Sequence, residues 1–276
     1  MTGLNVSLCF FVIVVAFGAA FRLIFRKWPR LRFAAEFSSS FVLVTCWLEV
    51  QTIIEVGEWV GGLGQDVSLT ILFMMLMTHG VIFGKATGNP SLTLMNFLLL
   101  ETTALPTLLV LAAQFLGAQL SLLVVGYYWA MELNDMHMIK NLMSRECSTA
   151  LRVSVVQGVF SEGACTFIFC LMYLTLKRQS AVIQLPLVAA VLTFLSYAAS
   201  GYTSAFMNPS LAYGLTFYCP GFTFIEYSVV YCLAPLIGMA LALLLYIGHI
   251  PRVFAKNLLY CQKNHFCVPK GEPKKK

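Results

Sequence analysis

Asn89-Pro90-Ser91 and Asn208-Pro209-Ser210 are two copies of one tripeptide, and each stands between a long apolar run and a shorter one. Asparagine is a strong helix N-cap and proline is well tolerated in the first helical turn, so each copy predicts a helix start. The runs that follow, 92–100 and 211–218, are too short to span a bilayer. Inside a membrane, such a start is allowed only where it is buried in protein or lines a water-filled cavity. The pair predicts two re-entrant half-helices around a pore or transport site at mid-membrane depth.

The composition is that of a polytopic membrane protein. The chain has 276 residues, of which 59% are hydrophobic and 11% charged, with a mean hydropathy of +0.81. Globular proteins have about 45–50% apolar and about 25% charged residues. The apolar runs are long rather than alternating ten-residue segments, which favours an all-α fold over a β-barrel. We expect seven spans, at residues 4–25, 33–54, 67–84, 104–126, 155–176, 184–203 and 226–248.

The order of these features predicts an inverted repeat. Each half contains three spans and one half-helix, and an odd number of spans turns the second half upside down relative to the first. The last span is interrupted by Pro235 and Gly238. The polar stretch between the halves contains Glu132 to Ser144, which could form an amphipathic surface segment but which we expect to be a solvated connector. The predicted units are an N-terminal transmembrane helix with a basic connector (1–30), a pore domain (31–250, with repeats 31–128 and 154–250) and a basic tail (251–276).

The net charge of +6 is explained by topology rather than by a nucleic-acid partner. Most of the 18 Lys and Arg residues fall after the first predicted span, at Lys85, at 177–178 and from Arg252 onward. Positively charged connectors face the cytosol, so the C-terminus is predicted to be cytosolic.

The nine cysteines show no metal-type Cys-x-x-Cys pairs, and no metal or cofactor site is expected. Most lie in apolar segments, where free cysteine behaves as a small hydrophobe. Cys147 and Cys219 fall in connectors on the predicted non-cytosolic side, so a disulfide is possible, although spacing alone cannot establish one.

Together these residues resemble the aquaporin (major intrinsic protein) family, whose members have six spans and two Asn-Pro-Ala boxes. The resemblance covers about residues 33–250 and includes Ala35-Glu36-Phe37, Gln114-Phe115-Leu116-Gly117, Glu162, Gly201-Tyr202-Thr203 and Pro235-Leu236-Ile237-Gly238 with Tyr231 before it. Altered first boxes and a cysteine after the second box, here Cys219, resemble the divergent superaquaporin branch. The two ends of the chain look like an intracellular member of that branch. This chain departs from the family in having Ser in place of Ala in both boxes and an extra N-terminal helix.

The resemblance implies a role for each predicted site residue. Asn89 and Asn208 would face each other on the pore wall and donate hydrogen bonds to passing water. Glu36 and Glu162 would brace the loops that carry the half-helices. Cys219 would stabilise either the loop after the second half-helix or a contact between subunits. The narrower selectivity filter would consist of Leu69, Ser196, Ala205 and Leu211.

The family usually has Arg at the position of Leu211, so this filter would be less polar than that of a strict water channel. We therefore expect passage of water and of small neutral solutes such as glycerol or hydrogen peroxide. The resemblance also implies a homotetramer in the lipid bilayer of an intracellular membrane, the endoplasmic reticulum or vesicles.

Other interpretations remain open from sequence. The altered boxes allow a non-conducting structural member of the fold, and the number of spans allows a seven-helix receptor, although a receptor explains neither box. His79 would line the cytosolic vestibule or pack between helices. Ala199-Ser200-Gly201 superficially resembles an intramembrane serine protease, but no span offers a convincing His partner, so no catalytic residue and no enzyme are expected.

Overall fold

The computed structural model describes residues 3–25, 31–61, 63–143, 147 and 149–248. Seven helices within these residues are long and apolar enough to cross a membrane, and no strand occurs among them. The helices that could span are α1 (Gly3–Phe25), α2 (Arg32–Gly61), α3 (Gln65–Phe83), α5 (Ala104–Ala130), α7 (Val155–Leu176), α8 (Ala181–Ala198) and the continuous segment of α10 (Phe224–Ser228), a π-helical turn (Val229–Leu233) and α11 (Ala234–Ile247). Most of the predicted basic connector and the tail lie outside the described residues.

The half-helices are α4 (Pro90–Leu98) and α9 (Pro209–Leu215), and each begins directly after its asparagine. Both end before the predicted limits of 100 and 218. Leu100 has a positive φ of 60°, and residues 216–222 form turns instead of further helix, so the apolar runs extend beyond the helices they contain.

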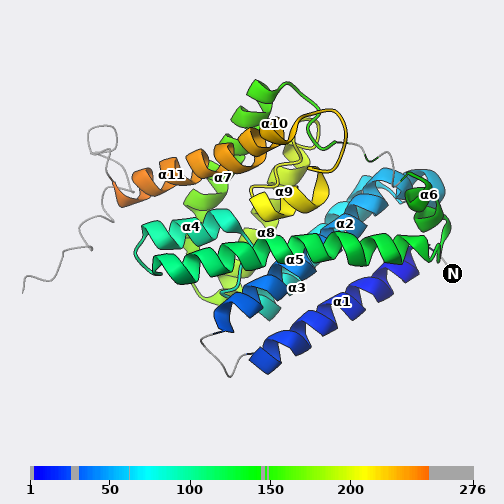
Figure 1. Cartoon of the computed structure of the whole chain (residues 1–276), viewed down its shortest axis with the longest axis horizontal. Helices are drawn as coiled ribbons and strands as arrows, with labels where there is room; N and C mark the ends of the chain where they lie inside the picture. The colour runs from blue at the N-terminus through cyan, green and yellow to red at the C-terminus, as the bar shows by residue number, and fades with distance from the viewer. Residues whose placement is uncertain (1–2, 26–30, 62, 144–146, 148, 249–276) are drawn as a thin grey trace, which may run out of the picture.

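The two repeats pack through matching pairs of helices. In the first, α5 crosses α2 at Gly117, where an added Cβ would lie 2.5 Å from the carbonyl oxygen of Phe37. In the second, α11 crosses α7 at Gly238, where an added Cβ would lie 2.2 Å from the carbonyl oxygen of Gly163. These glycines let two backbones approach closely within one subunit. Figure 1 shows the half-helices α4 and α9 held between the spanning helices.

The predicted interruption of the last span takes the form of a π-helical turn near the start of that span. Val229–Leu233 forms this turn immediately before Ala234 and Pro235. Proline has no N–H and its ring crowds the preceding turn, so widening the helix by one residue accommodates it. The segment remains one span.

The extra helix α1 lies along the outside of the bundle (Figure 1). One face is buried, with Ser7, Phe10, Val14 and Gly18 at helical spacing, and it packs against α2. The ring of Phe10 stacks on Tyr128 of α5 with centroids 3.8 Å apart. The remaining face is largely exposed and apolar, as expected for a surface in contact with lipid.

The prediction that residues 132–144 form a solvated connector is wrong. This stretch contains the helix α6 (Asp135–Met143), which packs against α2. His137 is fully buried, with its Nε2 2.8 Å from Oε1 of Glu49, and Lys140 pairs with Glu55 at 2.5 Å. Glu49 makes a contact that sequence alone does not reveal, because an acid inside an apolar span gives no sign of its partner. The partner comes from a segment 88 residues away.

Candidate permeation site

The asparagine of each box caps its own half-helix. The side-chain oxygen of Asn89 accepts a hydrogen bond from the Ser91 N–H at 2.8 Å. The oxygen of Asn208 accepts from the Ser210 N–H at 3.1 Å and from the Leu211 N–H at 3.4 Å. Each cap satisfies otherwise unpaired donors of the first turn, so the oxygen of each carboxamide is directed at its own helix.

The nitrogen of each carboxamide reaches across to the other repeat. Asn89 Nδ2 donates to the carbonyl of Met207 at 3.1 Å, and Asn208 Nδ2 donates to the carbonyl of Gly88 at 3.0 Å. Gly88 and Met207 each directly precede an asparagine, so the exchange is reciprocal. These two bonds bring the two helix starts together at one point, as the inverted repeat predicts.

Two buried glutamates hold the loops that carry these asparagines. Glu36 accepts from the Gly88 N–H and from Gln114 Nε2, both at 2.9 Å. Glu162 accepts from the N–H groups of Phe206 and Met207, both at 3.0 Å. A buried carboxylate is costly unless its oxygens are hydrogen-bonded, and here each acid meets backbone donors of one loop.

The loops themselves adopt conformations that few residues favour. Gly88 has a φ of +60°, and a Cβ there would lie 2.9 Å from the Ser40 nitrogen. In the second loop Ser204, Ala205 and Met207 all have positive φ without being glycine. Such backbone persists only where the surroundings impose it and is concentrated at functional sites.

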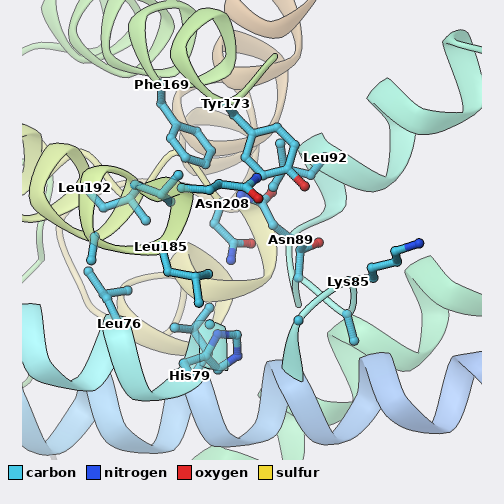
Figure 2. Close-up of a pocket in the computed structure, with 18 of the residues that line it drawn as sticks. Leu76, His79, Lys85, Asn89, Leu92, Phe169, Tyr173, Leu185, Leu192 and Asn208 are labelled. Carbon is cyan, nitrogen blue, oxygen red and sulfur yellow. The ribbon is translucent and has the colours of Figure 1, made fainter. Parts of the chain in front are cut away.

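Both asparagines line one cavity of about 590 Å³ (Figure 2). Its lining includes four charged residues at or just beyond the ends of α2, α3, α4 and α7, namely Arg32, Lys85, Glu101 and Lys177, which mark its mouth. The cavity is therefore a vestibule that opens on the predicted cytosolic side. His79 lines it, and its Nε2 lies 3.0 Å from Ser39 Oγ, so this residue both faces the vestibule and ties α3 to α2.

The vestibule ends just beyond the asparagine pair. Four helices contribute to this inner end, and the last lining residue on each is Trp47 on α2, Leu76 on α3, Phe169 on α7 and Leu192 on α8. Phe206 and Leu211 complete this end. Trp47, Leu76, Phe206 and Leu211 belong to one buried apolar cluster, and Leu192 packs against it. We call Trp47, Leu76, Leu192, Phe206 and Leu211 the apolar floor.

The four predicted filter residues do not meet in this vestibule. Only Leu211 lines it. Leu69 lines a shallow groove between α3 and α8 with Phe73 and Phe194. Ser196 and Ala205 are buried but are not part of the vestibule wall. The filter formed by these four residues therefore stays a prediction, and sequence alone missed the floor residues Trp47 and Phe206.

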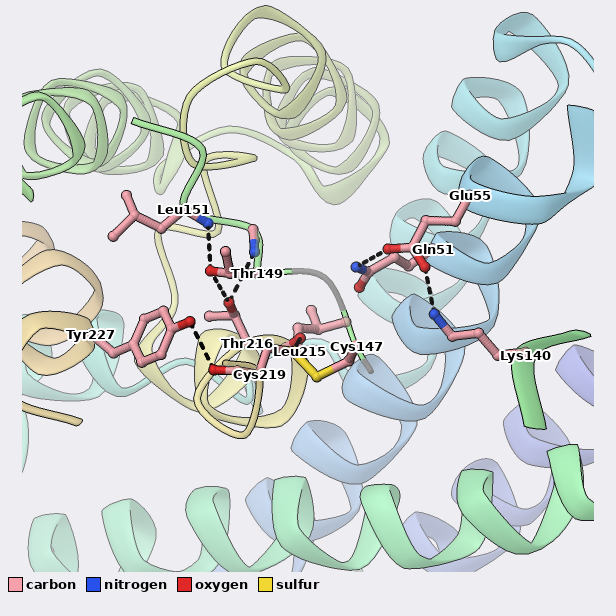
Figure 3. The surroundings of a disulfide bond; sticks show 11 residues. Gln51, Glu55, Lys140, Cys147, Thr149, Leu151, Leu215, Thr216, Cys219 and Tyr227 are labelled. Carbon is pink, nitrogen blue, oxygen red and sulfur yellow. Dashed lines mark hydrogen bonds and ion pairs between the residues drawn. A yellow bond between two sulfur atoms is a disulfide. The ribbon is translucent and has the colours of Figure 1, made fainter. Parts of the chain in front are cut away.

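Cys219 forms a disulfide with Cys147, the pairing that the sequence left open. Figure 3 shows this bond beside the end of α9, where Tyr227 donates to the Cys219 carbonyl at 3.0 Å. Thr216 Oγ1 accepts from the Ala150 N–H at 3.0 Å in the same region. The disulfide thus joins the loop after the second half-helix to the connector between the repeats. Within the described part of the chain, no group of three or more His, Cys, Asp or Glu residues could hold a metal ion.

Comparison with known proteins agrees with this arrangement. Residues 25–246 match the profile of the family described as Major intrinsic protein. The chain is 44% identical over 276 residues to Aquaporin-12 of Mus musculus, covering 99% of this chain and 95% of that protein. It is 28% identical over 223 residues to Aquaporin-11 of Homo sapiens, covering 79% of each. The predicted resemblance to the superaquaporin branch is thereby confirmed, and the member that the two ends of the chain resemble is aquaporin twelve.

A solved structure of similar fold is the aquaglyceroporin from Plasmodium falciparum, with a TM-score of 0.62 and 18% identity over 81% of this chain and 98% of that one. It confirms the predicted fold. The reciprocal asparagine pair, the braced loops and the family match lead to one conclusion: the chain is a multi-pass membrane protein that belongs to the major intrinsic protein family, in its superaquaporin branch, and the members of this family are channels and not enzymes.

Proposed function

We propose that this protein is a passive channel for water and small neutral solutes, such as glycerol or hydrogen peroxide, in an intracellular membrane. The observation that carries the proposal is the meeting of Asn89 and Asn208 on the wall of one vestibule. An amide nitrogen has two hydrogens, and the reciprocal bonds use one on each side chain. The second hydrogen is available to a solute oxygen at the point where the two half-helices meet.

Electrostatics favour neutral solutes at this point. The N-terminal ends of α4 and α9 meet there, and each helix end carries roughly half a positive charge. Arg32, Lys85 and Lys177 add positive charge around the mouth, against the single acid Glu101 in the lining. Cations and hydronium are therefore repelled, whereas a neutral solute exchanges its hydration for amide donors at little cost.

The missing arginine extends the proposal to solutes larger than water. Leu211 occupies the position after the second box that carries Arg in most family members, and it is 2% exposed in an apolar setting. An apolar wall discriminates poorly against carbon-containing neutral solutes. Glycerol is such a solute, and hydrogen peroxide is a neutral molecule only slightly larger than water.

The proposed topology rests on the distribution of charge, and the proposed location and assembly rest on the similarity to Aquaporin-12 and Aquaporin-11. The concentration of Lys and Arg on the vestibule side and in the tail supports a cytosolic C-terminus. We propose an intracellular membrane, the endoplasmic reticulum or vesicles, and a homotetramer. Gly117, Gly163 and Gly238 are used inside the subunit, so tetramer contacts would have to come from other surfaces.

Stopped-flow light scattering on proteoliposomes tests the proposal. We expect water flux above that of protein-free liposomes, together with glycerol flux and the arrival of hydrogen peroxide at an encapsulated reporter. Asn208→Ala should reduce all three fluxes, whereas Asn5→Ala, at an exposed position of α1, should leave them unchanged. Water flux without either solute would refute the solute range.

A second candidate function is a folded, non-conducting structural protein. The observation that favours it is the apolar floor, which ends the vestibule within the membrane. Correctly folded protein with no flux of water or of either solute above protein-free liposomes would support this candidate and refute the channel.

A further inference from the structure

The inner end of the vestibule is closed by the apolar side chains of the floor and not by polar groups. Along α8, Val188 and Leu192 line it, and Ser196 on the next turn does not. Along α3, Leu76 lines it, and Leu72 on the next turn toward the opposite side is 2% exposed within the same apolar cluster. The lining of the vestibule therefore ends at Leu192 on α8 and at Leu76 on α3.

Phe206 is at the centre of this end. Its ring lies 6.4 Å from the ring of Trp47, in an edge-to-face arrangement, and 5.5 Å from the ring of Tyr231. It is 4% exposed. Aromatic contacts on two sides, from α2 and from the last span, hold the ring in place.

The strained loop determines which side chain occupies this position. Glu162 fixes the Phe206 N–H, and the residues on either side, Ala205 and Met207, have φ values of +42° and +51°. Ala205 and Met207 consequently belong to a second apolar cluster, with Leu92, whereas Phe206 belongs to the cluster of the floor. Adjacent residues are thus directed to different sides, and the large one meets the vestibule.

A polar group lies beyond the floor. Ser196 Oγ is buried and has no hydrogen-bond partner among the described residues. It follows Leu192 by one helical turn, on the same face of α8. A buried hydroxyl without a protein partner in line with the vestibule fits a conduit that continues past the floor and is wetted there.

We propose that the aromatic pair Phe206 and Trp47 forms the constriction that limits flux and sets the solute size limit of this channel. The inference rests on the proposed function and adds the residues that determine its selectivity. A hydrophobic constriction limits passage because a chain of water molecules loses hydrogen bonds on crossing it. Two aromatic rings also leave less room than aliphatic side chains, so they exclude the larger neutral solutes first.

Flux through Phe206→Ala is the first test. We expect water flux to rise on the order of tenfold, equivalent to removing about 1.4 kcal/mol from the barrier. The ratio of glycerol to water flux should rise as well, which a merely structural role would not produce. Phe160→Ala is the matched control, since Phe160 is 78% exposed on α7. Phe206→Leu and Trp47→Leu should give smaller increases and replace the alanine variant if it does not fold.

Cysteine labelling tests the barrier independently of conduction. A membrane-impermeant anionic methanethiosulfonate is applied to the full-length protein from the side of the C-terminal tail, and labelling is read by mass spectrometry. Val188→Cys, inside the vestibule, should react, and Ser196→Cys, beyond the floor, should be protected. Equal labelling of both would overturn the proposal.

The two measurements separate this inference from the proposed function. Conducting wild type with unchanged flux ratios in Phe206→Ala, Phe206→Leu and Trp47→Leu would overturn the constriction and leave the channel intact. Protection of Ser196→Cys from labelling, together with no flux in any variant, would refute the proposed channel function but would support a barrier at Phe206 and Trp47.

Discussion

The two serines of the boxes have different surroundings although their motifs are identical. Ser210 Oγ lies 2.9 Å from both the Gly88 carbonyl and Asn208 Oδ1, so it is tied into the contact between the repeats. Ser91 Oγ is buried and has no partner among the described residues. A hydroxyl is costly to bury without a hydrogen bond, so the same residue type should have opposite effects at the two sites.

Ser210→Ala should therefore lower the free energy of unfolding by about 1 kcal/mol, the net value of a typical hydrogen bond. Ser91→Ala should be neutral or stabilising, because it removes an unpaired buried group. Thermal unfolding of the two purified variants in the same detergent provides the comparison. Equal losses of unfolding free energy in Ser210→Ala and Ser91→Ala would show that the hydrogen bonds of Ser210 give no specific stabilisation of the contact between the repeats.

Glu162 uses both carboxylate oxygens on backbone donors, and this makes glutamine a poor substitute. In Glu162→Gln the amide group can accept at one oxygen only, which leaves either the Phe206 or the Met207 N–H unpaired. We expect a cost of about 1–3 kcal/mol and a lower folding yield, with a smaller change in solute selectivity. Glu132→Gln, exposed and bonded through one oxygen to Asn141, is the control. A variant that folds normally but changes selectivity would contradict the bracing role.

Helices in this protein are held together by a few close contacts and by polar groups inside the membrane. The crossing of α7 and α11 depends on the absence of a side chain at Gly238, and the position of α1 depends on an acid of α2. Glu49 accepts from Ser7 Oγ at 2.5 Å and from Trp129 Nε1 at 3.1 Å, in addition to its contact with His137. One carboxylate thus joins α1, α2, α5 and α6.

Gly238→Ala should destabilise the protein by about 1–3 kcal/mol, as expected for overpacking a close helix contact. The backbones of α7 and α11 would have to separate, because the new Cβ meets a carbonyl oxygen and not a flexible side chain. Gly126→Ala is the matched control: nothing lies within 4 Å of its added Cβ, so alanine should be neutral or stabilising there. The melting temperatures of the two variants test this: a lower value only in Gly238→Ala is expected, and equal values would contradict the close contact of α7 with α11.

Glu49→Ala should loosen α1, because it leaves the buried donors Ser7 Oγ and Trp129 Nε1 without their acceptor, at a cost of about 1–3 kcal/mol for each unsatisfied group. Ser7→Ala removes a single hydrogen bond and should cost about 1 kcal/mol. Hydrogen exchange should show faster exchange confined to α1 and α6 in the glutamate variant. Unchanged exchange in α1 would indicate that apolar contacts alone, such as that of Phe10 with Tyr128, hold the helix.

At the scale of the whole molecule, the two faces of the membrane protein differ in what closes them. The vestibule side is open and basic. On the other side, α6 covers the end of α2, and the disulfide fastens the loop after α9 to the connector between the repeats. The side without the vestibule is therefore cross-linked by the disulfide and by the ion pair of Lys140 with Glu55.

Reduction of the disulfide, or Cys147→Ser, should lower the free energy of unfolding by about 2–4 kcal/mol, since the bond closes a long loop of the unfolded chain. The residues joined are 72 apart in sequence. Thermal unfolding with and without reductant measures the effect. Cys9→Ser, at an exposed free cysteine, is the control and should not change the melting temperature.

The sequence by itself determined the architecture of this protein. Apolar runs of spanning length, two asparagine-capped starts and an odd number of spans in each half lead to an inverted repeat with two half-helices, because unpaired backbone groups are not tolerated in lipid. It also identified the two asparagines, which are recognisable because a polar helix start is unusual at membrane depth, and they line the vestibule. The family resemblance added Glu36 and Glu162, which brace the loops of the half-helices, and Cys219, which lies on the opposite side.

Only the tertiary structure decided which side chains close the vestibule and how the additional helix is held. Ala205 and Phe206 are neighbours in sequence, and positive φ angles on either side of Phe206, enforced by Glu162, direct them to different clusters. Glu49 likewise finds His137 through the packing of α6 on α2. Backbone angles in strained loops and contacts between distant segments arise from three-dimensional packing, and a pattern of residue types along the chain does not encode them locally.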